Sequence, residues 1–401
     1  MLREQFPALD RQLYKRPMVY LDNVATSQTP LCVIEAINEG YIHAKANVHR
    51  GVHTLSQEAT ARQEHARERI RQWINARSTS EIIFTRGTTE AINLVAASFG
   101  QRFKPGDEII LTVMEHHANI VPWQLLQNRT GIKIKVVPIN PDGSLQLDVY
   151  RNLFTDRTRL ATFCHISNVL GTVNPVKEMT AYAHSLGVPT LIDGAQATAH
   201  LRPDMQDLDA DFYAFSLHKM YGPSGIGILY GKEQLLESMP PYQGGGEMIA
   251  HVSLTSPTTF AELPYKFEAG TPDFIGIGAT TAAIDFLEQA GIDKIHAHEQ
   301  KLLSEATSRL LNEIPNLEIY GTTPDKAPVI SFLIHPHHHY DIGLLLDKQA
   351  IEVRTGHHCA QPLMHALGID GTIRIGFAAY NTSQEIESLI QALKKIQQII
   401  S

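Results

Sequence analysis

The chain has few cysteines and no long apolar run. Its 401 residues include three cysteines, at positions 32, 164 and 359, without the CxxC spacing typical of zinc sites. Because three thiols cannot all pair with one another, the composition favours a reducing compartment, and we expect a cytoplasmic protein. No stretch approaches the roughly 18 apolar residues that a membrane span needs. The first residues, MLREQFPALD, lack the basic-then-apolar layout of a signal peptide.

Positive charge is also scarce. Lys and Arg total 34 against 42 for Asp and Glu, a net charge of −8. Such a balance argues against a broad surface for nucleic acid or anionic membranes. The densest histidine run, His335-Pro336-His337-His338-His339, places its imidazoles side by side rather than on one face, and no carboxylate or thiolate cluster joins it. We therefore expect no metal site and interpret this run as a polar turn.

What is present is a regular alternation of short apolar runs and amphipathic stretches between about residues 80 and 230. Helices are expected at 90–98, capped by Thr88 or Thr89, and from Ile120 onward. The apolar runs are the expected strands, at 81–85, 108–113, 132–138, 160–166, 189–192, 212–215 and 226–230. This alternation predicts an α/β fold with a mostly parallel, doubly wound sheet.

The pattern changes after about residue 280, where helical periodicity and short strands predict a smaller α+β domain. With 401 residues the chain is long enough for two cores. We expect three parts: an N-terminal arm at 1–20, a large domain at 21–285 and a small C-terminal domain at 286–401.

Polar residues gather just after five of the expected strands. Open α/β sheets bind ligands at the carboxyl ends of their strands, so these clusters are expected to line one crevice. The clusters are Gly87-Thr88-Thr89, Glu115 to Asn119, Ser167-Asn168, Asp193 to Gln196, and Ser216 to Lys219.

Lys219 has the neighbours that a Schiff-base lysine needs. Ser216 and His218 can donate hydrogen bonds to a phosphate, as can the amides of Thr88-Thr89 at a helix start. Asp193 ends a buried strand, where an unpaired carboxylate is costly and a protonated pyridine nitrogen would be a partner. A lysine, a phosphate cradle and an acid opposite a pyridinium are what pyridoxal 5′-phosphate (PLP) requires. We therefore predict PLP as the cofactor.

Three further residues are predicted to contact the cofactor or the substrate. His117 is expected to stack on the ring, where an imidazole can also move protons. The alternative for this histidine is a purely structural role. Gln196 is expected to reach the phenolic oxygen, and Asn168 to contact that oxygen or the substrate.

Cys359 is the candidate nucleophile. It follows Gly356-His357-His358, and neighbouring imidazoles favour the reactive thiolate form. Arg354 and Arg374 flank it, and a guanidinium binds an α-carboxylate bidentately. Cys164, in the middle of a strand, and Cys32, on a helical pattern, are instead expected to be small buried residues.

Two turn-like segments are expected to be ligand or subunit loops. The first spans residues 47–51 and offers His49 and Arg50 as candidate substrate contacts. The second spans residues 269–272, where Thr271 can donate to a phosphate.

The chain resembles group II cysteine desulfurases of the SUF type, which are fold-type I PLP enzymes of the aminotransferase class-V family. The resemblance extends over nearly the whole chain, from Tyr20-Leu21-Asp22 to the segment Ala379-Tyr380-Asn381-Thr382. Five motifs carry it in order: RGTTE at 86–90, EHHAN at 115–119, DGAQ at 193–196, HKMYGP at 218–223 and RTGHHCA at 354–360. The last separates group II from group I, in which the cysteine lies in a longer, serine-rich loop.

The resemblance implies a large domain with a seven-stranded sheet, a small domain that carries Cys359, and a role for each site residue. Lys219 would hold PLP and move the α-proton, Asp193 would pair with the pyridinium, Gln196 would contact the phenolate and His117 would stack on the ring. The phosphate would be held by Thr89, Ser216 and His218, next to Thr88, with Thr271 reaching in from the second subunit of a homodimer. The substrate carboxylate would be bound by Arg374 and Asn168, with Arg354, His49 and Arg50 nearby.

The implied reaction converts L-cysteine to L-alanine and leaves a persulfide on Cys359. Such an enzyme would supply sulfur for iron–sulfur cluster assembly through a SufE-like or SufU-like acceptor protein. A selenocysteine lyase, which shares the fold and the pocket, is the alternative. The sequence departs from the usual pattern at Leu217, Asn23-Val24 and Ile375 to Phe377. These departures bear on substrate preference and remove none of the proposed catalytic groups.

Overall fold

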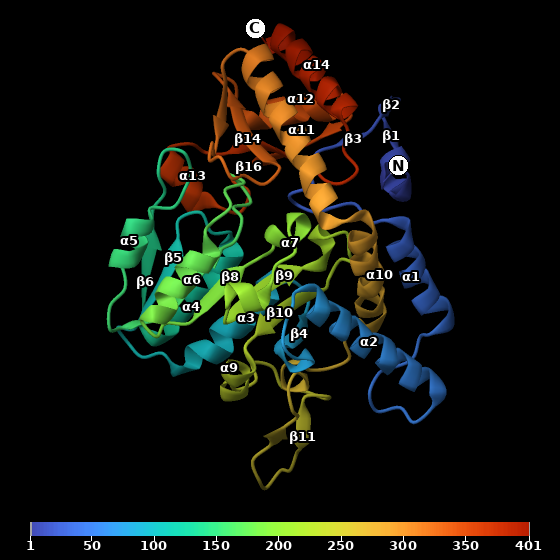
Figure 1. Ribbon diagram of the computed structural model, residues 1–401, viewed down its shortest axis with the longest axis vertical. Coiled ribbons are helices and arrows are strands. Elements are labelled where there is room, and N and C mark those ends of the chain that lie inside the picture. Colours follow the sequence, from blue (N-terminus) through green and yellow to red (C-terminus); the bar gives the residue numbers. More distant parts are fainter. Residues whose placement is uncertain (1, 401) are drawn as a thin grey trace.

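The computed structural model describes residues 2–400 and contains a large sheet with a smaller one above it (Figure 1). The large sheet has seven strands in the order β4-β10-β9-β8-β7-β5-β6. Neighbouring strands are parallel except that β10 is antiparallel to both β4 and β9. The predicted α/β class with a mostly parallel seven-stranded sheet is therefore confirmed. The strands are β4 (Ile82–Thr85), β5 (Glu108–Thr112), β6 (Lys133–Val137), β7 (Thr158–Cys164), β8 (Thr190–Asp193), β9 (Phe212–Ser216) and β10 (Gly227–Gly231).

Both faces of this sheet are covered, which explains the continuous apolar runs of its strands. On β5, Ile109 and Leu111 belong to one buried core and Ile110 to another, on the opposite face. The connecting helices supply the cover. They are α1 (Leu31–His43), α2 (Thr54–Trp73), α3 (Thr88–Ser98), α4 (Val121–Thr130), α5 (Leu147–Asn152), α6 (Val176–Ser185), α7 (Ala197–His200), α8 (Met205–Leu208), α9 (Glu233–Ser238) and α10 (Phe274–Ala290).

The smaller sheet is antiparallel, in the order β13-β14-β17-β16, and has its own core. The first and the third strand in this order were not predicted from the sequence. The core, which includes Ile330, Phe332 and Ile373, lies under three helices. The elements are α11 (Ile292–Glu313), β13 (Leu317–Tyr320), β14 (Val329–Ile334), α12 (His339–Asp347), β16 (Arg354–Gly356), α13 (Gln361–Leu367), β17 (Thr372–Gly376) and α14 (Ser383–Ile400). The division of the chain near residue 285 stays a prediction.

The N-terminal residues tie the two sheets together. Strand β3 (Val19–Tyr20) pairs in parallel with β15 (Ile351–Glu352), next to the smaller sheet. The following residues, 21–28, which we call the strap, run across to the large sheet. In the strap, Asn23 donates to the Gly376 carbonyl (2.7 Å), and the Ser27 amide donates to the His218 carbonyl (3.1 Å). The strap therefore joins the strand that bears Arg374 to the turn that bears Lys219.

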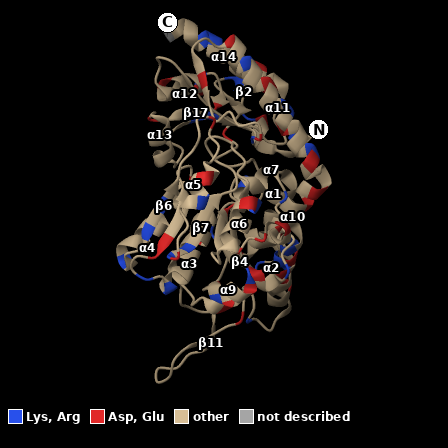
Figure 2. Ribbon diagram, turned by 60° about the vertical axis from the view of Figure 1, so that its left-hand side comes forward, with Lys and Arg blue, Asp and Glu red and all other residues tan. Residues whose placement is uncertain are grey.

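The surface carries mixed charge. In Figure 2 acidic and basic residues alternate along outer helices such as α2 and α11. No helix within residues 2–400 is both long and apolar enough to cross a membrane. The hairpin of β11 (Ile249–His251) and β12 (Thr259–Phe260) projects from the body below α9 (Figure 1). Cys164 is buried as expected, but Cys32 is exposed near the start of α1, so the prediction that it is buried was wrong.

Candidate active site

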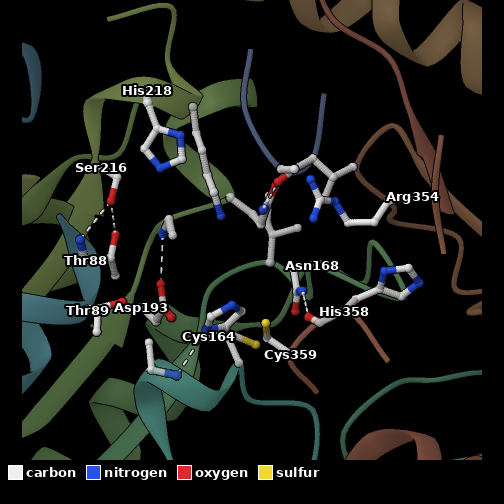
Figure 3. Close-up of a pocket in the computed structure, with 18 of the residues that line it drawn as sticks. Thr88, Thr89, Cys164, Asn168, Asp193, Ser216, His218, Arg354, His358 and Cys359 are labelled. Atoms are coloured by element: carbon white, nitrogen blue, oxygen red, sulfur yellow. Dashed lines mark hydrogen bonds between the residues drawn. The ribbon is translucent and has the colours of Figure 1, made fainter. Parts of the chain in front are cut away.

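One cavity opens at the carboxyl ends of the large sheet's strands, between the two sheets. Most of the site residues predicted from the sequence meet there, and Figure 3 labels several of them. The expectation that the polar clusters line one crevice is therefore met. The predicted residues in its wall are Thr88, Thr89, Asn168, Asp193, Gln196, Ser216, His218, Lys219, Arg354, Cys359 and Arg374.

A hydroxyl cluster lies at the first turn of α3. The Ser216 Oγ accepts from the Thr88 amide (2.8 Å) and lies 2.7 Å from the Thr88 hydroxyl (Figure 3). Gly87, rather than either threonine, is the N-cap residue, so the threonine hydroxyls are not used to cap the helix. The turn packs directly on β10, where a Cβ added at Gly227 would lie 2.3 Å from the Gly87 Cα. A helix start next to two hydroxyls makes a cradle for an anion.

Lys219 is placed opposite a buried acid. Although its side chain faces the cavity, the surrounding protein removes most of its hydration, which lowers its pKa to about 8, against the opposing effect of Asp193. Burial raises the pKa of Asp193, whose Oδ1 accepts from the Ala195 amide (3.0 Å). Burial, with the nearby Lys219, also lowers the pKa of His218 to about 4. The amine is thus the readily deprotonated group of the site, as a nucleophilic lysine needs to be.

Glu115 holds the turn after β5 in place, a role that was not predicted from the sequence. It is fully buried, and burial raises its pKa to about 7. Its carboxyl group accepts from the Thr112 hydroxyl, the Asn119 side chain (2.7 Å) and the Cys164 amide (3.0 Å). The first and last residues of the EHHAN motif therefore hold the turn in place, and the two histidines between them are free to point elsewhere.

Those two histidines point in different directions. His116 lines the cavity, and burial together with the charge of Lys219 lowers its pKa to about 4. His117 does not line the cavity. Its ring faces His357, with 5.6 Å between the ring centroids, and its Nε2 accepts from the Gln361 amide (3.3 Å). His116, rather than His117, therefore faces the cavity, one residue away from the position for which ring stacking was predicted.

The loop that carries Cys359 is clamped through its backbone. The His117 amide donates to the Cys359 carbonyl (2.7 Å), and Asn168 donates to the His358 carbonyl (2.8 Å). His358 and Cys359 have φ angles of 52° and 56°, a left-handed conformation that costs energy for residues with a Cβ. Two adjacent residues in this state persist only because the surrounding contacts hold them. The thiol, exposed at the cavity wall, is therefore presented by a constrained loop.

The two predicted arginines line the cavity together, and Asp22 contacts both of them. Arg354 forms a bidentate pair with Asp22, with Nη2 2.7 Å from Oδ2 and Nε 3.0 Å from Oδ1. Arg374 donates to the Asn168 carbonyl (3.0 Å), while its Nε is buried without a hydrogen-bond partner. Burial lowers the pKa of Arg374 to about 10. A buried guanidinium with an unused donor is suited to receive a carboxylate.

Besides His117, three predicted residues lie away from this cavity in the single chain. His49 contacts Gln63 (3.3 Å) and the ring of Tyr265. Arg50 pairs with Glu247 (3.3 Å). Thr271 is exposed and lines a separate hollow together with Arg86 and Glu90. The chain by itself therefore does not bring these residues to the site.

Comparison with known proteins gives a consistent result. The aminotransferase class-V family profile matches residues 19–389. The chain is 51% identical to a cysteine desulfurase of Cronobacter sakazakii and 50% identical to one of Escherichia coli. Both alignments cover 400 residues, which is 100% of this chain and 98% of the relative.

Solved structures agree. The cysteine desulfurase CsdA of Escherichia coli, in an S-sulfonic acid form, has a TM-score of 0.91 at 40% identity, covering 99% of this chain and 98% of that one. The cysteine desulfurase of Thermococcus onnurineus has a TM-score of 0.93 at 37% identity, covering 98% and 97%. A C-DES variant with glycine covalently linked to its PLP cofactor has a TM-score of 0.83 at 26% identity, covering 98% of both chains.

Proposed function

This chain belongs to the aminotransferase class-V family, and from that premise we infer that it is a PLP-dependent cysteine desulfurase that transfers the sulfur of L-cysteine to Cys359. The observation that carries the inference is the meeting, in one cavity, of a buried lysine, an anion cradle and a clamped thiol loop. A protein that used PLP only for amino transfer would have no need of the thiol.

The residues present are suited to PLP. The cradle of Thr88 and Ser216 would hold the phosphate, and Asp193 would hold the protonated ring nitrogen, which explains a carboxylate buried at this end of β8. His116 would lie against the ring, and Gln196, which lines the cavity and donates to the Val24 carbonyl (2.8 Å), would lie near the phenolic oxygen.

Bound PLP supplies an electrophilic carbonyl carbon and a ring that takes up an electron pair. Lys219 supplies the amine that joins the cofactor to the protein. Because its pKa lies at about 8, the Nζ group can both give up and accept a proton near neutral pH, so it would move the proton between the substrate's α and β carbons. Asp193, as a fixed negative charge, would keep the ring nitrogen protonated.

Arg374 would bind the α-carboxylate of the substrate. Its side chain is 4% exposed, and its buried Nε has no hydrogen-bond acceptor in the protein. The carboxylate of the substrate would supply that acceptor. Its contact with the Asn168 carbonyl ties it to the residue that also holds the Cys359 loop. Carboxylate binding and thiol placement therefore depend on the same asparagine.

The sulfur transfer balances without a further reagent. A bond forms between the Cys359 Sγ and the substrate sulfur, and the substrate carbon–sulfur bond breaks. The Cβ keeps the electron pair and takes a proton, giving L-alanine, while Cys359 becomes a persulfide. The substrate Cβ is therefore reduced by two electrons, and the two sulfur atoms of the persulfide are together oxidised by two electrons. The exposed position of Cys359 leaves the persulfide open to an acceptor.

A single turnover tests the inference. Without reductant, L-cysteine should give one equivalent of L-alanine and an adduct of about 32 Da on the Cys359 peptide. The variant Cys359→Ala should give neither, whereas Cys32→Ala, which removes the other exposed thiol, should behave like wild type. Full desulfuration by Cys359→Ala, or an adduct on Cys164, would sink the mechanism. Selenocysteine cleavage retained by Cys359→Ala would instead point to the selenocysteine lyase alternative for that substrate.

The proposal includes two protein partners. Thr271, His49 and Arg50 are site residues only if a second copy of the chain brings them to the cavity, so we propose a homodimer with shared sites. Since the clamped loop holds the thiol at the cavity wall, we also propose that a SufE-like or SufU-like protein comes to the cavity to collect the sulfur. That protein should discharge the adduct on Cys359 in the experiment above. We also propose that the enzyme supplies sulfur for iron–sulfur cluster assembly and that it works in the cytoplasm.

A further inference from the structure

One face of α2 carries buried polar side chains, where a helix packed against a protein core normally carries apolar ones. The four residues follow one another at intervals of three or four, so they lie on the same side of the helix. They are Ser56, Thr60, Gln63 and Arg67, which we call the α2 stripe. Ser56, Gln63 and Arg67 are each at most 1% exposed. Burying polar groups costs free energy unless they are hydrogen-bonded, so the stripe needs partners.

The first three residues of the stripe hold the loop that carries His49. The Ser56 hydroxyl donates to the Asn47 carbonyl (2.6 Å), and the Thr60 hydroxyl accepts from the His49 amide (2.7 Å). The Gln63 Nε2 lies 3.3 Å from the His49 Nε2. Both the backbone and the ring of His49 are therefore tied to α2.

The last residue of the stripe holds the segment that carries Thr271. The Arg67 guanidinium pairs bidentately with the Glu268 carboxylate, with Nη1 2.7 Å from Oε1 and Nη2 2.9 Å from Oε2. The side chain of Arg67 is 0% exposed and that of Glu268 is 8% exposed, so solvent screens this pair little. Glu268 precedes Thr271 by three residues. Two parallel, charge-assisted hydrogen bonds fix the direction in which this segment leaves the body of the chain.

The two loops also contact each other beside the stripe. The His49 and Tyr265 rings lie edge to face, with 5.3 Å between their centroids. The Arg67 guanidinium lies 5.6 Å from the centroid of the same Tyr265 ring. His49 and Thr271 therefore belong to one connected unit, and both lie away from the cavity of their own chain.

We propose that the α2 stripe holds His49 and Thr271 as one preformed half of the neighbouring subunit's site, with Arg67 as the positioning residue for Thr271. The inference rests on the homodimer of the proposed function, in which Thr271 reaches the phosphate of the cofactor in the second subunit. Arg67 acts there only through Glu268. Without Arg67, the Glu268 carboxylate stays buried without its bidentate partner, and the segment that leads to Thr271 shifts.

The first test compares the dissociation constants of PLP and of pyridoxal, which lacks the phosphate, for the apoprotein. Arg67→Gln should raise the PLP value about tenfold and the pyridoxal value less than about threefold, because only the phosphate contact is disturbed. Thr271→Ala should do the same. The double variant should bind PLP no more than about threefold more weakly than either single variant, because both changes remove one contact.

The matched control is Arg69→Gln. Arg69 lies on another face of α2 and pairs with Asp285 (2.6 Å) and Glu288 (2.8 Å) on α10. This variant should bind both ligands within about twofold of wild type. Equal losses of PLP and pyridoxal affinity in Arg67→Gln, or losses that multiply in the double variant, would indicate general damage to the fold and would overturn the proposal.

Mixed dimers decide which of the two sites Arg67 serves. A role within its own chain is the competing explanation, because Glu268 also accepts from the Phe84 amide (2.7 Å) on β4, the strand before the phosphate cradle. The Arg67→Gln and Lys219→Ala proteins are mixed, and the absorbance of lysine-bound PLP is followed as PLP is added. Sites of wild-type affinity should appear, since the mixed dimer joins an intact Lys219 to a Thr271 segment held by an intact Arg67.

The second mixture reverses the expectation. Arg67→Gln mixed with Thr271→Ala should produce no sites of wild-type affinity, because every site then lacks a well-placed Thr271. The opposite pattern, a gain with Thr271→Ala and none with Lys219→Ala, would show that Arg67 serves its own chain's cradle and would overturn the proposal. Should Arg67→Gln fail to fold, Glu268→Gln keeps an acceptor for the Phe84 amide, loses the ion pair and is used in the same mixtures.

These outcomes separate the inference from the proposed function. If Thr271→Ala leaves PLP binding unchanged, or if the protein sediments as a monomer, the shared site of the proposed function fails and this inference fails with it. If Thr271→Ala weakens PLP binding and Arg67→Gln does not, only the role of Arg67 is refuted. Sulfur transfer to Cys359 is tested by neither titration and stands or falls by its own experiment.

Discussion

Gly227→Ala should weaken PLP binding by disturbing the phosphate cradle from behind. An added Cβ would lie 2.3 Å from the Gly87 Cα and 2.5 Å from its carbonyl carbon. Carbon atoms in contact prefer a separation of about 3.5–4.0 Å, so the turn before α3 must move by more than about 1 Å. Both contacts are with backbone, which cannot turn away as a flexible side chain can.

The expected size follows from that displacement. Misplacing a positioning group by about 1 Å costs on the order of 100-fold, so the dissociation constant of PLP should rise about 100-fold, or about 2.8 kcal/mol. The assay is titration of the apoprotein with PLP, followed by cofactor absorbance and protein fluorescence. The same titration with pyridoxal, which lacks the phosphate, should change less than threefold.

The matched control is Gly187→Ala. Gly187 has a φ of +71°, so alanine is strained there, but no atom lies within 4 Å of the added Cβ. This control should lower the free energy of unfolding by about 1–2 kcal/mol and leave PLP binding unchanged. An equal loss of PLP and pyridoxal affinity in Gly227→Ala would refute the reasoning, because it would mean that the substitution damages the whole site rather than the cradle.

Two other predictions concern the ring and the second subunit. His116→Ala should weaken PLP binding about fivefold and shift its absorbance band, through loss of a stacking partner, whereas His117→Ala should leave both unchanged; the opposite result would return the role to His117. Thr271→Ala and Lys219→Ala proteins should each be impaired alone but regain activity when mixed, because a mixed dimer holds one site with both residues intact. No gain on mixing, with the subunits shown to exchange by sedimentation, would contradict a site shared between subunits.

The sequence was sufficient for the large sheet because its strands are buried on both faces. An apolar run such as 108–112 is continuous, and the polar residues that follow it mark the strand's carboxyl end. The same logic failed at β17. Its five residues, Thr372–Gly376, are all buried, but Arg374 stands in the middle and breaks the apolar run. The arginine was identified as a functional residue, while the strand that positions it was missed.

Asp22 shows a second limit, set by distance along the chain. Its partner Arg354 lies 332 residues away, and nothing near Asp22 in sequence marks it as the acid behind the two arginines. The pairing exists because β3 joins β15 and the strap then passes Gly376. Such a contact depends on how the N-terminal residues return to the smaller sheet, which periodicity and turn chemistry do not encode.

The choice between His116 and His117 was beyond sequence reasoning for a different reason. Both follow the same strand, have the same chemistry and differ by one position in a turn. The outcome depends on the anchors around them, because Glu115 and Asn119 are tied to each other by a hydrogen bond of 2.7 Å. That constraint turns His116 toward the cavity and leaves His117 to hold the Cys359 loop through its amide and its ring nitrogen. Two adjacent histidines thus serve the two halves of the site, one facing the cofactor region and the other supporting the thiol loop, so their substitution should separate cofactor binding from thiol placement.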